Sequence, residues 1–242
     1  MNLSFQRSAR QLIVYDADCI QRPETDWFYP EYWRQKGMIT GHAPGRGSAW
    51  ILDTPFGNAV LRKCLRGGRM AHLSREKYLF TGYHNSRPIA EMQLLARLQA
   101  RTLPVPQPLA GLCRRSGLTY TGALLTRLIA PAKPLAEILM EAPVGLVPWF
   151  RIGQCIRRFH DAGVVHPDLN ARNILLGANP VALQDIYLLD FDKADVREGN
   201  VSSSRSNLPR LHRSLQKLWP AGKKAELPTC WQKLTDGYNT SL

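Results

Sequence analysis

Alternation of apolar and polar positions predicts several short strands in the first half of the chain. Four apolar runs have the length of strands and are bounded by Gly, Pro, Asp or Asn: residues 12–15, 49–52, 59–62 and 120–128. Short runs separated by such turn residues are typical of antiparallel hairpins. Between the third and fourth runs, the proline-rich segment 103–108 is expected to form a stiff, extended connector.

Apolar residues at helical spacing dominate the second half. In segment 149–160, four large apolar residues recur on one helical face: Trp149, Ile152, Ile156 and Phe159. In segment 207–219, four leucines do the same: Leu208, Leu211, Leu215 and Leu218. Two further helices are expected at 135–140 and, in the first half, at 88–99. The pattern therefore predicts an α+β protein, with a strand-rich lobe at 1–128 and a mainly helical lobe at 129–242.

Composition places the chain among globular proteins of a reducing compartment. Its 242 residues are 44% hydrophobic, and the five cysteines form no C-x-x-C pair. No uncharged apolar run reaches the roughly 18–20 residues of a membrane span, and Asp16 and Asp18 interrupt the apolar run nearest the N-terminus. A formal net charge of +13 predicts an anionic partner: nucleic acid, phospholipid or a phosphorylated substrate.

Two polar motifs beside apolar runs indicate phosphoryl transfer. The first is H-P-D-L-N-A-R-N at 166–173, and the second is L-L-D-F-D at 188–192. In this pattern Asp168 takes the proton of an attacking hydroxyl group, and Asn173 and Asp190 hold the Mg²⁺ that bridges the phosphates of ATP. Asp and Asn are also common in turns, and that is the competing interpretation.

A glycine-rich segment and a basic strand end are candidates for phosphate contacts. Gly45 and Gly47 lie in segment 41–48, where glycines either close over phosphates or only form a hairpin turn. Arg62 ends the run 59–62 and Lys63 follows it, and adjacent strand residues point to opposite faces. Arg62 is favoured as the phosphate-binding residue, with a solvated basic edge as the alternative.

The helix predicted at 88–99 carries a charge on its apolar face. Glu91 shares a helical stripe with Leu94, Leu95 and Leu98. A carboxylate on a core-facing stripe needs a partner, because an unpaired buried charge is strongly unfavourable. We expect that partner to be Arg62, unless Glu91 lies at the edge of a solvated face.

Taken together, the sequence motifs of this chain resemble those of the 3-deoxy-D-manno-octulosonic acid (Kdo) kinase family of Gram-negative bacteria. The resemblance covers about residues 28–218 and is carried by YPEYW (29–33), TGHAPGRG (40–47), LRKCLRGG (61–68), YLFTG (78–82), LPVP (103–106), DLNARNILL (168–176) and LDFD (189–192). It implies a protein-kinase-like fold of two lobes with a truncated C-lobe. It also implies transfer of a phosphoryl group from ATP, with Mg²⁺, to the 4-hydroxyl group of Kdo on a lipid A precursor.

The same resemblance implies a peripheral protein at the cytoplasmic face of the inner membrane. The basic residues Arg210, Arg213 and Lys217 of the predicted helix 207–219 are candidates for contact with anionic headgroups. In the alternative interpretation, the leucines of this helix pack into the C-lobe and its basic residues only face water.

Two other functions compete with this one. A kinase-like enzyme could act on another acceptor, such as a core heptose, an aminoglycoside or a protein. A basic nucleic-acid-binding protein would explain the charge, but the chain has no zinc-finger spacing and no RRM string. We therefore expect no nucleic-acid partner.

Overall fold

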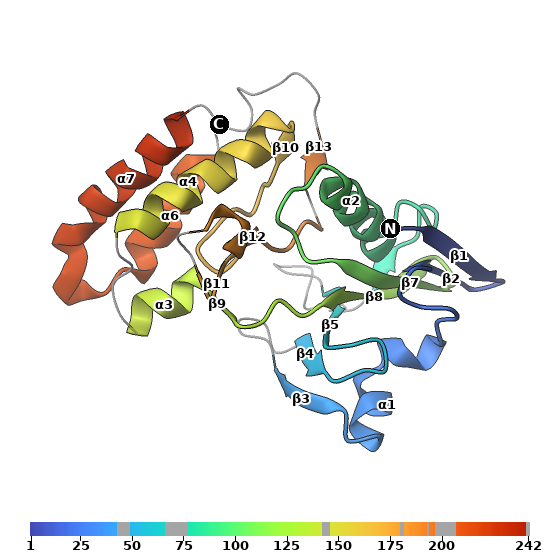
Figure 1. Ribbon diagram of the computed structural model, residues 1–242. Helices are drawn as coiled ribbons and strands as arrows, with labels where there is room; N and C mark the ends of the chain where they lie inside the picture. Colours follow the sequence, from blue (N-terminus) through green and yellow to red (C-terminus); the bar gives the residue numbers. More distant parts are fainter. Residues whose placement is uncertain are drawn as a thin grey trace. The chain divides into compact units, whose positions relative to one another are not determined.

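The computed structural model describes residues 1–42, 49–65, 77–141, 146–179, 182–192, 194–196 and 207–240 (Figure 1). The chain divides into two compact units. The first contains Met1–Arg101 and Pro106–Leu128, and the second contains Thr102–Val105 and Ile129–Leu242. Residues 102–105, which the sequence pattern places in the first lobe, pack with the second unit. There the Pro104 carbonyl accepts a hydrogen bond from the Leu188 N–H (3.1 Å), and the Thr102 carbonyl accepts one from the Arg158 side chain (2.9 Å).

An antiparallel sheet forms the centre of the first unit. Its strands follow the order β1-β2-β7-β8-β5-β4-β3, and β6 pairs with β8. The strand bounds are β1 Leu3–Ser8, β2 Gln11–Asp16, β3 Ile39–His42, β4 Ala49–Leu52, β5 Ala59–Lys63, β6 Tyr78–Leu79, β7 Pro108–Ser116 and β8 Thr119–Arg127. The four strands predicted from the sequence are confirmed as β2, β4, β5 and β8, and the α+β class with them, whereas β1, β3, β6 and β7 were not among the predicted runs.

Helices lie against both faces of this sheet. Helix α2 (Arg87–Ala100) packs on β7 and β8, and Leu94, Leu95 and Leu98 are buried, as its apolar stripe predicted. The 3-10 helix η1 (Thr25–Phe28) and helix α1 (Pro30–Gln35) supply Phe28 and Trp33 to a core cluster on the other face (Figure 1).

Helices dominate the second unit. They are α3 (Leu135–Glu141), α4 (Leu146–Asp161), α6 (Asn207–Leu218) and α7 (Leu227–Asn239), with 3-10 turns η3 (Leu183–Asp185) and η4 (Ala221–Glu226). Two small sheets complete it: β12-β11-β9 (Ile186–Leu188, Ile174–Gly177 and Ala132–Pro134) and β10-β13 (Val164–Val165 and Asp195–Val196). Among the helices that the structure describes, none combines the length and the apolarity needed to cross a bilayer.

The backbones of α4 and α7 approach closely at two glycines. A Cβ atom at Gly153 would overlap the carbonyl oxygen of Leu234, and one at Gly237 would overlap the carbonyl oxygen of Phe150. Only glycine leaves room for this contact. The apolar face of α4 predicted from Trp149, Ile152, Ile156 and Phe159 is buried, as its spacing predicted.

Candidate active site

The loop that carries Asp168 is organised around the backbone carbonyl of that residue. It follows β10, and the side-chain amides of Asn170 and Asn173 both donate hydrogen bonds to the Asp168 carbonyl, at 2.8 and 2.9 Å. The Asn170 side-chain oxygen in turn accepts the Arg172 N–H at 2.9 Å. These local bonds fix the backbone at Asp168, while its carboxylate stays 32% exposed and can be reached by another molecule.

Strand pairing brings Asn173 and Asp190 to the same end of a small sheet. In the antiparallel register of β11 and β12, Ile174 lies opposite Leu188, so the residue before β11 meets the residues after β12. The Leu189 N–H donates to the Asn173 carbonyl at 2.9 Å. One hairpin therefore brings together the backbone segments of the two motifs that carry Asn173 and Asp190.

The chemistry of this pair fits Mg²⁺. Because the side-chain nitrogen of Asn173 donates to the Asp168 carbonyl, its amide oxygen is the atom left to ligate a metal. Asp190 adds a carboxylate, and Mg²⁺ prefers oxygen ligands from one or two such groups plus water and substrate phosphates. Asp190 also has φ +67°, a conformation that non-glycine residues adopt rarely and that is enriched at functional sites.

His166 connects the motif that contains Asp168 with the motif that contains Asp190. Its Nε2–H donates to the Leu189 carbonyl at 2.8 Å, and its ring lies edge-on to Phe191 with centroids 4.9 Å apart. Phe191 stacks in turn on Phe159 of α4. Burial lowers the pKa of His166, so the ring is neutral at pH 7 and acts here as a packed hydrogen-bond donor. It fixes the residue before Asp190 to the loop of Asp168.

Helix α6 holds this loop through three side chains on one of its faces. Asn207 Oδ1 accepts the His166 N–H at 3.1 Å, and Ser214 Oγ accepts the Ala171 N–H at 3.2 Å. Between them, Arg210 Nη2 lies 2.8 Å from Asp168 Oδ1. Spacings of three and four residues place Asn207, Arg210 and Ser214 on a common stripe, which we call the loop-facing stripe.

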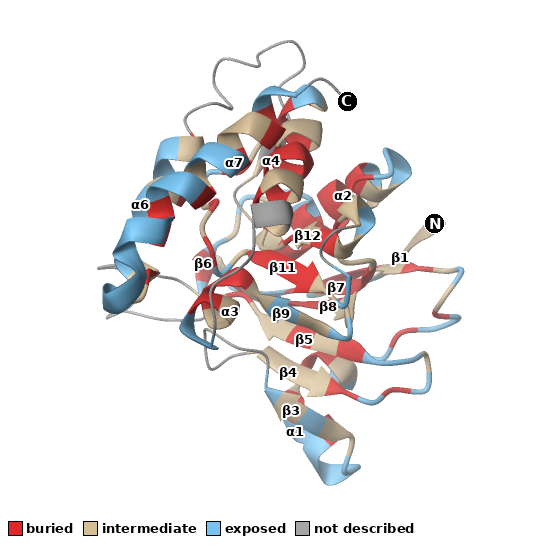
Figure 2. Cartoon of the chain, turned by 60° about the vertical axis from the view of Figure 1, so that its left-hand side comes forward, coloured by how far each residue is buried: buried red, intermediate tan, exposed pale blue. Residues whose placement is uncertain are grey.

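This placement changes the interpretation of Arg210. The sequence reading grouped it with Arg213 and Lys217 as a side chain left for anionic headgroups, whereas it forms an ion pair with the candidate catalytic carboxylate. Leu211 and Leu215 are buried, so the leucine face of α6 packs into the second unit, while Arg213 and Lys217 are exposed (Figure 2).

A buried histidine supports the first residue of the loop-facing stripe. His160 Nε2 donates to Asn207 Oδ1 at 3.2 Å, and its Nδ1 accepts the Tyr238 hydroxyl at 2.8 Å. Burial lowers the pKa of His160 to about 4, which keeps the ring neutral and fits one donating and one accepting nitrogen. Side chains of α4 and α7 thus fix Asn207, and through it the start of the loop that carries Asp168.

In the first unit, the predicted ion pair between Arg62 and Glu91 is present. Arg62 Nη2 lies 2.5 Å from both carboxylate oxygens of Glu91. The Glu91 side chain is 2% exposed and the Arg62 side chain 28% exposed. The carboxylate is therefore a core residue of α2 and not the edge of a solvated face, and it ties α2 to β5.

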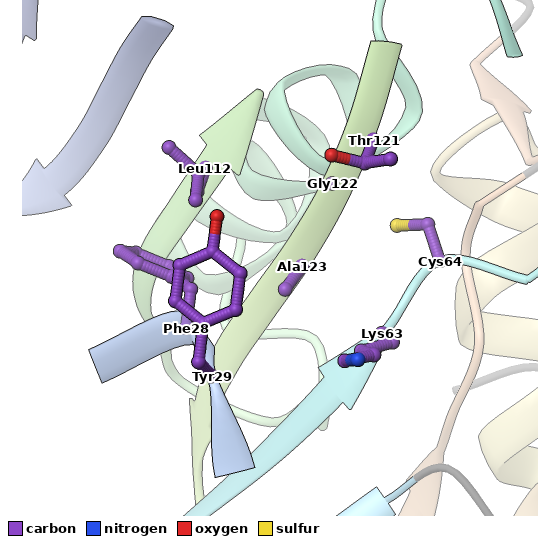
Figure 3. Close-up of a pocket in the computed structure, with 8 residues that line it drawn as sticks. All are labelled: Phe28, Tyr29, Lys63, Cys64, Leu112, Thr121, Gly122 and Ala123. Carbon is purple, nitrogen blue, oxygen red and sulfur yellow. The ribbon is translucent and has the colours of Figure 1, made fainter. Parts of the chain in front are cut away.

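Lys63 lies on the other face of β5. It lines a small pocket of about 50 Å³ together with Phe28, Tyr29 and Cys64 (Figure 3). Neighbouring strand residues point to opposite faces, so Arg62 and Lys63 cannot serve the same site. The other predicted phosphate-binding residues, Gly45 and Gly47, lie outside the described residues.

Comparison with known proteins gives consistent matches over most of the chain. The model of the lipopolysaccharide kinase (Kdo/WaaP) family matches residues 30–238. A 3-deoxy-D-manno-octulosonic acid kinase of Stenotrophomonas maltophilia (strain R551-3) is 42% identical over 206 residues, which are 85% of this chain and 80% of that protein. The protein of the same name in Xanthomonas campestris pv. campestris (strain B100) is 38% identical over 226 residues, 93% of this chain and 88% of that protein.

A solved structure shows the same fold. The chain described as WaaP in complex with acyl carrier protein superposes with a TM-score of 0.52 at 15% sequence identity, and the match covers 86% of each chain. At this identity the likeness concerns the fold alone, and it confirms the fold class expected from the sequence.

Proposed function

Because the chain belongs to the lipopolysaccharide kinase (Kdo/WaaP) family, we propose that it transfers a phosphoryl group from ATP to the 4-hydroxyl group of Kdo on a lipid A precursor. The identity of 42% with Kdo kinases supports this acceptor. The observation that carries the proposal is the convergence of Asp168, Asn173 and Asp190 through one loop and one hairpin.

In this proposal Asp168 receives the proton of the acceptor hydroxyl group. A general base must lie within hydrogen-bond reach of that hydroxyl, and the partly exposed carboxylate on a backbone fixed by Asn170 and Asn173 meets this requirement. Arg62, held by Glu91, is proposed to contact the phosphates of ATP through guanidinium N–H groups beyond those that bind Glu91.

Asn173 and Asp190 are proposed to hold Mg²⁺. When bound, the ion would neutralise negative charge on the phosphates. The two residues contribute an amide oxygen and a carboxylate from the same end of the β11–β12 hairpin. The hydrogen bond from Asn173 to the Asp168 carbonyl would couple this metal position to the position of the base.

Asp190→Asn is expected to raise the Mg²⁺ concentration that gives half-maximal transfer by at least about tenfold. Even residues that only support a metal ligand typically change affinity 10–100-fold, and loss of a ligand's charge should cost no less. The measurement is a Mg²⁺ titration at saturating ATP. Asp161→Asn, which changes an exposed carboxylate paired with Arg157, should leave the titration unchanged. An unchanged titration for Asp190→Asn would remove this residue from the metal site.

The acceptor is tested directly by mass spectrometry. A Kdo-bearing lipid A precursor is incubated with the protein, ATP and Mg²⁺, and the products are fragmented to locate the added mass. One phosphate on the Kdo unit supports the proposal. Phosphate on a core heptose of a longer acceptor, with none on Kdo, would replace it with the heptose-kinase alternative.

We further propose that the protein binds the anionic surface of the inner membrane peripherally, at its cytoplasmic face. Arg213 and Lys217 on α6, and Lys223 and Lys224 on η4, are exposed. Leu211 and Leu215 are buried in the second unit, which leaves the exposed face of α6, with Arg213 and Lys217, for such a surface. Each basic residue close to an anionic membrane contributes about 1 kcal/mol, screened over roughly 8 Å at physiological salt.

Vesicle binding tests the membrane proposal. We expect the protein to sediment with anionic but not with neutral vesicles, and less so as salt increases. The double substitution Arg213→Glu/Lys217→Glu should weaken this binding at least about tenfold, given the contribution per charge. Arg34→Glu/Lys36→Glu, at the C-terminal end of α1 and the residue that caps it, makes the same change in net charge and is the control. Equal losses in both double variants would mean that net charge, and not the basic face of α6, determines binding.

A further inference from the structure

Arg210 forms an ion pair with the candidate base Asp168, and this ion pair uses only part of the hydrogen-bond donors of the Arg210 guanidinium group. A guanidinium group carries five N–H donors. The ion pair with Asp168 uses Nη2 at 2.8 Å, and the Arg210 side chain is 50% exposed. Among the residues that the structure describes, Asp168 is its ion-pair partner. An anion that arrives next to Asp168 therefore meets a half-exposed guanidinium group.

The attachment of α6 to the loop does not depend on this ion pair. Asn207 and Ser214 bind the loop backbone on either side of Arg210, and Leu211 and Leu215 are fully buried beneath it. Ion pairs between partly exposed side chains contribute little to stability. The position of Arg210 thus calls for an explanation other than holding the helix in place.

The ion pair with Arg210 also competes with the proposed role of Asp168 as general base. Asp168 Oδ1 already accepts a hydrogen bond from Arg210, and a base must accept one from the acceptor hydroxyl group at the moment of transfer. A ligand that draws the guanidinium group away would remove this hydrogen bond, and the acceptor hydroxyl group could take its place.

The acceptor named in the relatives has a group suited to that exchange. An octulosonic acid carries a carboxylate on the same sugar as its hydroxyl groups. A hydroxyl bound to Asp168 therefore places the carboxylate within one sugar ring of Arg210. Arginine matches a carboxylate with two parallel N–H groups, which gives orientation as well as affinity.

We propose that Arg210 binds the carboxylate of the acidic sugar acceptor, and that this change of partner releases Asp168 Oδ1 to receive the acceptor hydroxyl group. This inference rests on the proposed function and adds to it the residue that selects an acid. A neutral sugar would leave Arg210 on Asp168 and would be a poor acceptor for that reason.

The test pairs a change in the protein with a change in the acceptor. The detergent-solubilised precursor is compared with the same precursor whose Kdo carboxylate has been converted to a carboxamide. We expect the wild type to prefer the acid by about 10–100-fold in kcat/KM, which is the size of effect that hydrogen bonds to a charged group produce. Arg210→Gln should lose most of that preference, mainly through a higher KM for the acid. Arg210→Lys should keep part of it, because a charge remains without the planar pair of donors.

Arg157→Gln provides the matched control, since it removes another arginine–aspartate ion pair (2.6 Å) from the second unit. It should keep the wild-type preference. The inference is wrong if Arg210→Gln prefers the acid as strongly as the wild type, or if it loses activity equally on both acceptors, as a purely positioning residue would. Absence of transfer to the acid by the wild type would instead reject the proposed function, and the inference with it.

Discussion

Asp168→Asn should lower phosphoryl transfer by at least about 10²–10⁴-fold, the usual contribution of a general base. Asparagine has nearly the same shape but cannot take up the proton of the acceptor hydroxyl. The bonds that order the loop run from Asn170 and Asn173 to the Asp168 backbone carbonyl, so they survive this change. The effect should therefore appear in kcat, with the affinity for ATP close to that of the wild type.

Initial rates with the Kdo-bearing precursor, together with calorimetric titration of ATP, separate these two quantities. Asp161→Asn on α4 removes a carboxylate of similar exposure from the same unit and should transfer at the wild-type rate. If Asp168→Asn retained most of its turnover, the loop 166–173 would not be the catalytic loop.

Arg62 and Glu91 should show strong, unequal effects on stability. Arg62→Met removes this partner from a carboxylate that is 2% exposed, and loss of one member of a buried pair typically costs about 3–5 kcal/mol in the free energy of unfolding. Glu91→Gln should cost less, because the Arg62 side chain is 28% exposed and can turn toward water. The double variant should be less destabilised than the sum of the single variants.

A double-mutant cycle from chemical denaturation measures this coupling, expected at about 0.5–3 kcal/mol for contacting residues. Lys133 and Glu141 form an exposed pair at 2.8 Å and should couple by no more than about 1 kcal/mol. Strict additivity for Arg62 and Glu91 would contradict the ion pair in solution.

The sequence predicted those parts of the protein that depend on local spacing. The position of Glu91 among leucines three, four and seven residues away placed it in the core and required a basic partner. The motif around Asp168 and Asn173, followed by an apolar run into Asp190, gave the candidate site residues, but the pairing of β11 with β12 that brings the two segments together was not predicted. Strand β7 was missed because Leu109, Ala110 and Gly111 form a continuous apolar run that lacks the alternation and the β-branched residues of a typical strand.

The contact between Arg210 and Asp168 could not be predicted in the same way. The two residues are 42 positions apart. The leucine spacing of 207–219 fixed which face of the helix is buried, but it carried no information about the segment against which the helix packs. The only sequence signal was the recurrence of Asn207, Arg210 and Ser214 on one stripe, which has meaning only once the docking partner is known.

The loop-facing stripe also has a consequence for the order in which the protein becomes active during synthesis. The ribosome releases the chain from its N-terminus, and the loop that carries Asp168 leaves it well before α6 does. Until Asn207 and Ser214 arrive, the His166 and Ala171 N–H groups lack the acceptors that hold them in the finished protein. The nascent chain therefore carries Asp168, the proposed base, for some 40 residues without the helix that braces it. Catalytic competence should be among the last properties that the growing polypeptide gains.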